Sequence, residues 1–249
     1  MDNIKVIVIG ENCTDKFIYG SVNRLCPEAP VPILNPYKST KNPGMAGNVV
    51  ENIKALKKNC DIKFIHQEVK ITKTRFVDEQ SNQMIIRVDE GEDNIKPLVL
   101  TKELIDDISS ADIVIVSDYN KGFLSNEVLN SISNYASCSI LDSKRIMLPI
   151  FKNFTFIKLN KSERLQQKDG LIEDLNIITT LGKKGAEYGS QVYPSPMPRD
   201  TIDVSGAGDT FTASFILKYY ETKDVKTSIY FANTKASDVV SRRGVVVPK

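Results

Sequence analysis

The densest group of residues suited to chemistry lies at 203–210, where small residues lead into Asp209 and an apolar segment follows. Gly206, Ala207 and Gly208 let a backbone approach a ligand closely. The unpaired N–H groups and the dipole at the start of a helix favour an anion there. Asp209 is therefore placed to accept a proton from an attacking hydroxyl, with a phosphoryl group in front of the helix. The alternative is that Asp209 only caps the helix and the glycines only form a turn.

The helix dipole leads us to expect a lowered pKa for Asp209, which would make it a weak base. Phosphoryl transfer tolerates a weak base, because it depends mainly on positioning and electrostatics and only late on proton removal.

Two further polar segments follow predicted strands. Asn160 and Glu163 come directly after the apolar run at 154–159, and Thr180, Gly182 and Gly185 belong to or follow the run at 177–181. Either Asn160 or Glu163 could be an ordinary helix cap.

The elements that must position these residues indicate an α/β fold with one domain over residues 1–249. Short apolar runs without polar alternation are typical of a mostly parallel central sheet covered by helices on both faces. Prolines within 17–37 favour edge strands, and two alternating runs within 71–90 favour a hairpin, so these ranges predict a small β flap, or lid. The predicted strands of the central sheet are 4–9, 112–117, 139–142, 154–159 and 177–181, and the predicted helices are 44–56, 126–135, 210–220 and 225–240.

Composition and charge exclude several other classes. With 33 basic and 31 acidic residues, the net charge of +2 gives no overall attraction to nucleic acid or to an anionic membrane. The apolar run at 4–9 is too short for a signal peptide or a membrane span, so we expect a cytoplasmic protein. Zinc chemistry is disfavoured, because His66 is the single histidine and the four cysteines form no CxxC pair: Cys13, Cys26, Cys60 and Cys138.

In this order, the three polar segments resemble the ribokinase family of sugar kinases. The resemblance implies that Asp209 is the catalytic base and that the backbone of Gly206, Ala207 and Gly208 forms an anion hole. It also implies ATP and Mg²⁺ as cofactors. The family's nucleotide and magnesium motifs correspond here to Asn160 and Glu163, with Glu163 as the metal residue, and to Thr180, Gly182 and Gly185 beside the nucleotide.

Residues 19–32, which end in Pro-Glu-Ala-Pro-Val-Pro, closely resemble the flap of the D-glycero-D-manno-heptose 7-phosphate kinases. The resemblance implies phosphorylation of that sugar phosphate to the 1,7-bisphosphate, in the biosynthesis of ADP-heptose for surface polysaccharide. It also leaves a homodimer through the β lid open, because flap strands in related kinases often pair with a partner. The substrate-binding residues that it implies are Asp15, Asn48, Asp118, Lys121 and Arg75.

The sequence departs from this subgroup in three ways. A strand–helix segment expected between residues 56 and 71 is missing, and Met45 replaces a glycine near the predicted sugar site. Many members carry a fused nucleotidylyltransferase domain, for which this chain has no room, so we expect another protein to supply that step.

Three readings compete with this function. The first is a kinase for another sugar or sugar phosphate, and the second is a degenerate sugar or nucleotide binder without catalysis. Intact Asp209, Asn160 and Glu163 argue against the second. A dinucleotide-dependent oxidoreductase is discarded, because Gly10 is followed by residues 11–13 without a second glycine.

Overall fold

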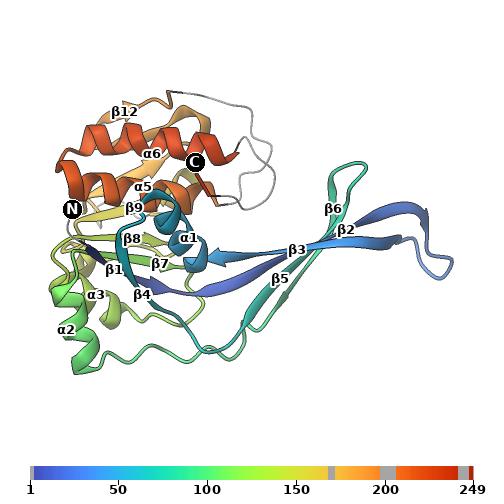
Figure 1. Cartoon of the computed structure of the whole chain (residues 1–249), viewed down its shortest axis with the longest axis horizontal. Helices are drawn as coiled ribbons and strands as arrows, with labels where there is room; N and C mark the ends of the chain where they lie inside the picture. Colours follow the sequence, from blue (N-terminus) through green and yellow to red (C-terminus); the bar gives the residue numbers. More distant parts are fainter. Residues whose placement is uncertain (1–2, 168–171, 197–205, 241–246, 249) are drawn as a thin grey trace.

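The chain folds into an α/β body from which a long β arm extends (Figure 1). The computed structural model describes residues 3–167, 172–196, 206–240 and 247–248. Of the small-residue segment at 203–210, residues 203–205 lie outside this part of the chain. Within the described residues, no helix has the length and apolar character needed to cross a membrane.

The body is built on an eight-stranded sheet with the order β12-β11-β10-β9-β8-β7-β1-β4. The six strands from β10 to β4 are parallel, and β11 and β12 are antiparallel, which confirms the predicted mostly parallel sheet. These strands are β1 (Ile4–Gly10), β4 (Cys60–Ile65), β7 (Ile113–Asp118), β8 (Ser139–Ser143), β9 (Phe156–Asn160), β10 (Ile177–Thr180), β11 (Ala186–Tyr188) and β12 (Gln191–Tyr193).

Helices cover both faces of this sheet, because alternate strand residues feed two separate hydrophobic cores. Val6 and Ile113 pack into the core with α1 (Ala46–Leu56), α5 (Ala207–Thr222) and α6 (Val225–Val240). Their neighbours Ile7 and Val114 pack into the opposite core with the helices below the sheet in Figure 1. Those helices are α2 (Lys102–Ser110) and α3 (Asn126–Tyr135), while the short α4 (Lys161–Leu165) follows β9.

Helix α2 was not predicted from the sequence. Thr101 caps its N-terminus by accepting a hydrogen bond from the Leu104 N–H. Only Leu104 and Ile108 are buried along it. Two apolar residues one helical turn apart are too few to establish a helical period in the sequence. The adjacent apolar run at 98–100 masks the pattern further.

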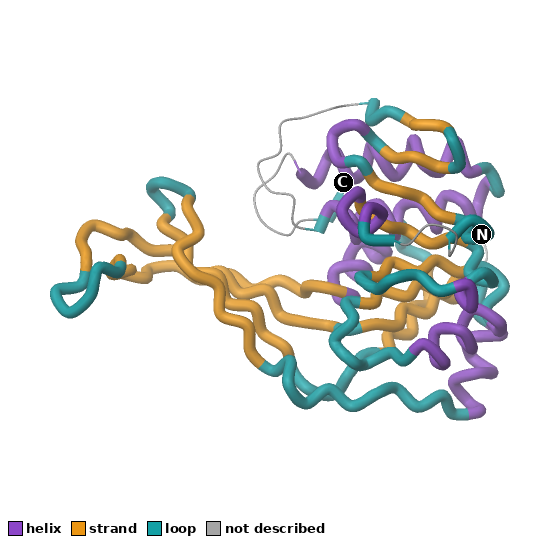
Figure 2. The backbone as a smooth tube through the Cα atoms, turned by 180° about the vertical axis from the view of Figure 1, so that it is seen from behind, coloured by secondary structure: helices purple, strands orange, loops and turns teal. Residues whose placement is uncertain are grey.

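The arm is a four-stranded sheet with the order β3-β2-β5-β6, and Figure 2 shows it from behind as it leaves the body. The pairs β2–β3 and β5–β6 are antiparallel, as the flap and hairpin predictions required, whereas β2 and β5 run parallel. Pro36 and Pro43 lie on the edge strand β3, where a missing N–H is tolerated. The strands are β2 (Asn12–Leu25), β3 (Pro32–Met45), β5 (Ile71–Asp78) and β6 (Gln83–Glu90).

The path from α1 to the arm is short. Strand β4 is the edge of the eight-stranded sheet, and only residues 66–70 separate it from β5. No helix lies between these two strands among these described residues, in agreement with the missing segment inferred from the sequence.

Candidate active site

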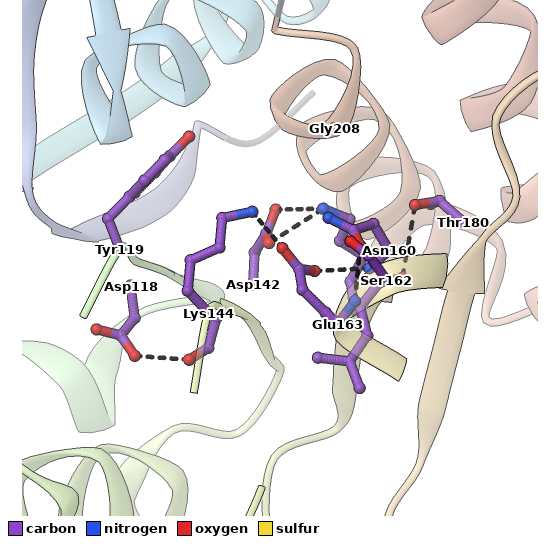
Figure 3. Close-up of polar contacts among 12 residues, drawn as sticks. Asp118, Tyr119, Asp142, Lys144, Asn160, Ser162, Glu163, Thr180 and Gly208 are labelled. Carbon is purple, nitrogen blue, oxygen red and sulfur yellow. Dashed lines mark hydrogen bonds and ion pairs between the residues drawn. The ribbon is translucent and has the colours of Figure 1, made fainter. Parts of the chain in front are cut away.

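A cavity of about 710 Å³ opens where the carboxyl ends of the central strands meet the start of α5. Ligands bind at this edge of open α/β sheets, because loops and helix N-termini converge there. The cavity is lined by Asp142 on β8, by Lys158 and Asn160 on β9, by Thr180 on β10, and by Asp209 on α5. The polar contacts around it are drawn in Figure 3.

The start of α5 has the backbone geometry of an anion site. Gly206 is the N-cap with φ 81°, a left-handed conformation that glycine adopts without strain. The first hydrogen bond of the helix runs from the Thr210 N–H to the Gly206 carbonyl at 2.9 Å. The N–H groups of Ala207, Gly208 and Asp209 therefore have no partner within the helix, and all three residues line the cavity.

Asp209 is 7% exposed and is held from two sides. The side-chain amide of Asn48 on α1 donates a hydrogen bond to it at 2.8 Å. The Tyr119 hydroxyl, in the loop after β7, donates a longer one at 3.4 Å. These contacts fix the orientation of the carboxylate towards the cavity.

The predicted lowering of the Asp209 pKa is wrong. Burial, followed by the charge of Asp142, raises this pKa to about 6, although the Asn48 hydrogen bond and the charges of Lys158 and Lys144 act in the opposite direction. Loss of hydration in the closed site outweighs the helix dipole. The resulting carboxylate is a better base than an exposed aspartate and is still ionised at neutral pH.

A buried ion pair between Lys158 and Asp142 lies next to the anion site. The Lys158 ammonium lies 3.0 Å from both carboxylate oxygens of Asp142, and the Thr212 hydroxyl donates to the same carboxylate at 3.0 Å. A Cβ atom on Gly208 would lie 3.0 Å from the Lys158 nitrogen, so the ammonium packs directly against the turn. Sequence reasoning missed Lys158; the signal was a lysine inside an otherwise apolar strand.

Asn160 and Glu163 form a capping box on α4. The Asn160 side chain accepts from the Glu163 N–H at 2.9 Å, and the Glu163 carboxylate accepts from the Asn160 N–H at 2.6 Å. Lys144 also forms an ion pair with Glu163, as Figure 3 shows. Capping of α4 is thus enough to explain why Asn160 and Glu163 occur at these positions. Asn160 also lines the cavity.

The residues present fit a magnesium ion that is held mainly by nucleotide phosphates. Mg²⁺ usually keeps several waters and takes only one or two carboxylates from the protein. Asp142 and Glu163 offer two such carboxylates near the cavity, each now paired with a lysine. Among the described residues no cluster of three or more potential metal ligands occurs. The role of Glu163 at a metal therefore stays a prediction.

Thr180, Gly182 and Gly185 line the same cavity, as expected for the predicted nucleotide loop. Gly182 has φ 62° and Gly185 has φ 95°. A Cβ atom on Gly185 would lie 2.1 Å from the Tyr193 carbonyl oxygen, so packing on β12 already requires a glycine there.

The structure does not bring the five predicted substrate residues into one group. Asn48 contacts Asp209, whereas Asp15 on β2 and Arg75 on β5 form an ion pair at the base of the arm. Lys121 pairs with Glu92. These three residues of the arm and its neighbouring loop do not line the cavity.

Asp118 is turned away from the cavity. Its carboxylate is fully buried and accepts hydrogen bonds from the Arg145 guanidinium and the Ser143 hydroxyl, both at 2.6 Å. It also accepts from the Asn120 N–H at 3.0 Å. These bonds order the loop after β7, and the contact of Asp118 with the sugar stays a prediction.

Glu11 was also missed by the sequence reasoning. Its buried carboxylate accepts from the N–H groups of Tyr119 at 2.8 Å, Lys121 at 3.0 Å and Phe123 at 3.3 Å. Burial raises its pKa despite these bonds. Glu11 thereby holds the loop that carries Tyr119 next to Asp209.

Comparisons of sequence connect this site to known proteins. Residues 149–249 match the model of the pfkB family of carbohydrate kinases. The "Bifunctional protein HldE" of Helicobacter pylori strain J99 is 30% identical over 297 positions, which cover 96% of this chain and 63% of that protein. The protein of the same name from Campylobacter curvus is 27% identical and is covered to 62%. The chain thus spans less than two thirds of these relatives, and the alignment, longer than the chain itself, shows that they carry segments absent here.

Solved structures share the fold at low identity. A ribokinase of Arabidopsis thaliana, complexed with ribose and ATP, superposes with a TM-score of 0.71 at 14% identity, covering 98% of this chain and 94% of that one. Phosphofructokinase-2 of Escherichia coli gives a TM-score of 0.72 at 16% identity, covering 100% and 96%. Residues 149–249 thus match the pfkB family of carbohydrate kinases, and the chain as a whole has a ribokinase-like fold.

Proposed function

We propose that this chain transfers the γ-phosphoryl group of ATP to a sugar phosphate, with Asp209 as the base. The observation that carries the proposal is the pairing of a buried carboxylate with an open helix N-terminus. Asp209 is 7% exposed, is oriented by Asn48, and lies in the first turn of α5.

The geometry supports an in-line transfer. A sugar hydroxyl bound beside Asp209 attacks the γ-phosphorus, the new oxygen–phosphorus bond forms, and the bond to the β-phosphate oxygen breaks. The proton of the hydroxyl passes to Asp209. The N–H groups of Ala207 and Gly208, with the ammonium of Lys158 behind them, stabilise the negative charge on the transferring group. Asp142 and Glu163 would hold Mg²⁺ near the nucleotide phosphates, where the ion would neutralise part of their negative charge.

D-glycero-D-manno-heptose 7-phosphate is the proposed substrate and its 1,7-bisphosphate the product, as a step towards ADP-heptose for surface polysaccharide. The support comes from the proline-rich flap at 19–32, which forms the turn and adjoining strand ends of β2 and β3. Cations at the base of the arm, among them Lys73 and Arg75, suit an acceptor that already carries a phosphate.

The proposed enzyme works in the cytoplasm, where ATP is supplied, and pairs through its arm into a homodimer. Exposed apolar side chains on the arm, such as Leu25, Met84 and Ile86, support the pairing. Sedimentation velocity of the wild type and of Ile86→Lys tests this: a dimer that the substitution converts to monomer supports the pairing, and a monomeric wild type contradicts it.

The experiment that tests the function is an ADP-release assay with Mg-ATP and a panel of sugars and sugar phosphates that includes heptose 7-phosphate. Phosphorus NMR of the product identifies the oxygen that receives the phosphoryl group. Fastest turnover on heptose 7-phosphate, with a new phosphate at the anomeric position, is the expected result. Faster turnover on another sugar would keep the kinase and reject the heptose assignment, and no turnover on any sugar would reject catalysis.

A further inference from the structure

Glu92 bridges two lysines that come from different parts of the chain. Its carboxylate lies 2.8 Å from the ammonium of Lys73 on β5 and 2.6 Å from that of Lys121 in the loop after β7. Both bonds are charge-assisted and short. One carboxylate held between two ammonium groups has the arrangement of an anion bound in a site.

The chain is shaped to bring Glu92 to this place. Gly91, directly after β6, has φ 84°, and a Cβ atom there would lie 2.2 Å from the Lys70 carbonyl oxygen. Any other residue would thus meet both backbone strain and a backbone collision. The tight turn returns the chain over the base of the arm, so that the next residue, Glu92, reaches both lysines.

Lys121 belongs to the loop that contacts Asp209, and Lys73 lies on the strand that pairs with β2. Lys121 is two residues after Tyr119, whose hydroxyl contacts Asp209 at 3.4 Å, and Glu11 holds the N–H groups of both residues. On the other side, Lys73 lies beside Asp15 in the pairing of β5 with β2. Cys13 on β2 packs in a small cluster with Met45 and Tyr119, and the charges of both Lys73 and Asp209 act on the pKa of its thiol.

The partial exposure of these three side chains and their charges allow a phosphate to displace the Glu92 carboxylate from the two lysines. The side chains of Lys73, Lys121 and Glu92 are 12%, 35% and 21% exposed, so the group is partly sheltered and still open to solvent. Asp89 lies 3.4 Å from Lys73 and supplies a weaker second contact. A phosphate carries more charge and one more free oxygen than a carboxylate, and it therefore competes well for two ammonium groups.

We propose that Lys73 and Lys121 form the subsite for the phosphate that the sugar substrate already carries, and that Glu92 occupies this subsite until the substrate displaces it. The inference rests on the proposed function and deepens it. Glu92 then acts as an internal competitor: it keeps the two lysines in place and weakens the binding of sugars that bring no phosphate to replace it.

Three substitutions and one matched control test this. Glu92→Gln removes the competing charge and keeps the shape, whereas Lys73→Met and Lys121→Met each remove one ammonium group. Glu221→Gln is the control, because Glu221 also bridges two lysines, Lys57 at 2.8 Å and Lys218 at 3.4 Å, far from the arm. The KM and kcat of each variant are measured with heptose 7-phosphate and with the same heptose without its phosphate, and thermal unfolding confirms folding.

We expect Glu92→Gln to lower the KM for heptose 7-phosphate by about 3- to 10-fold with kcat and the KM for ATP unchanged. Each lysine substitution should raise that KM by about 10-fold or more, with less than about 2-fold effect on kcat/KM for the unphosphorylated heptose. Glu221→Gln should change neither. An unchanged or raised KM in Glu92→Gln, or equal effects of the lysine substitutions on both sugars, would overturn the subsite.

A binding measurement separates this inference from the proposed function. Calorimetric titration with heptose 7-phosphate needs no turnover, so it tests the subsite even if no ADP is released. Tighter binding to Glu92→Gln than to the wild type, and loss of binding in Lys121→Met, would support the subsite alone. Equal affinities in all three proteins would reject it, whether or not the chain is a kinase.

Discussion

The amide of Asn48 on α1 donates a hydrogen bond to the carboxylate of Asp209 on α5 at 2.8 Å, across 161 positions of sequence. Asn52, one turn further along α1, donates to Asn48 and accepts from the Thr210 hydroxyl at 2.7 Å. This buried network joins the two helices at the anion site. The orientation of the proposed base therefore depends on a helix from the opposite end of the chain.

Replacing Asn48 by Ala should shift the acidic limb of the kcat/KM profile to higher pH by about half to one unit. The Asn48 hydrogen bond favours the charged form of Asp209, so its loss raises the Asp209 pKa. Asn153→Ala, which alters an exposed asparagine bonded to Asn134, serves as control and should leave the profile in place. If the acidic limb of the kcat/KM profile stays at the same pH in Asn48→Ala, the Asn48 hydrogen bond does not lower the Asp209 pKa.

In the wild type, kcat/KM should fall with a slope of one as pH decreases through about 6, the pKa of Asp209. The charged or titratable groups that face this carboxylate are Asp142 on β8, Lys158 on β9, Lys144 after β8, and Tyr119 after β7. Activity that stays constant down to pH 5 would exclude a base with this pKa.

Asp209→Asn should abolish catalysis and stabilise the fold. Because the folded pKa of about 6 lies above the ordinary value of 3.8, the folded state binds more protons between these values, and stability falls as pH rises through that window. The ionised carboxylate therefore costs on the order of 3 kcal/mol above pH 7. We expect Asp209→Asn to raise Tm at pH 8 by about 5 °C and to leave it nearly unchanged at pH 4. A lowered Tm at pH 8 would contradict the assigned cause.

Much of the architecture could be predicted, because the central strands are short and mainly apolar and the arm has the prolines of an edge strand. Helix capping by Asn160 or Glu163 could also be predicted, as the alternative to a role at the nucleotide or the metal. Lys158 could not be assigned to the site, since a single strand does not reveal that Asp142 from the neighbouring strand meets its ammonium at 3.0 Å.

The pKa of Asp209 was mispredicted for a related reason. Local sequence reveals the helix dipole but not the burial, which comes from packing against distant elements such as the one that carries Asn48. The pairing of Asp118 with Arg145 was likewise not visible in the sequence, because the two residues lie 27 positions apart.

Gly208→Ala should lower kcat by about 10- to 100-fold with little change in the KM for ATP. The new Cβ atom would lie 3.0 Å from the Lys158 nitrogen and would push the ammonium away from the turn and from Asp142. Gly189→Ala is the control for a methyl group added outside the site: no atom lies within 4 Å of its Cβ position, and Tm reports the backbone strain that its φ of 61° adds. A normal kcat in Gly208→Ala would show that the position of the Lys158 ammonium does not matter for phosphoryl transfer.

Asn160→Ala should destabilise the start of α4 by about 1 kcal/mol, because the Glu163 N–H loses its acceptor. If Asn160 also contacts the nucleotide, the KM for ATP should rise by more than the change in stability explains. Ser125→Ala, which removes the cap of α3, gives the reference for cap loss alone. Equal Tm changes and an unchanged KM for ATP in both variants would leave Asn160 with the capping role only.

The central claim, that Asp209 is the base of a kinase, is tested most directly by pre-steady-state ADP formation in the wild type and in Asp209→Asn. Nucleotide affinity is measured on both proteins by calorimetry. The account predicts rapid ADP formation with sugar phosphate in the wild type, a loss of at least about 1,000-fold in Asp209→Asn, and equal ATP affinities. ADP formation at a similar rate in both proteins would contradict it.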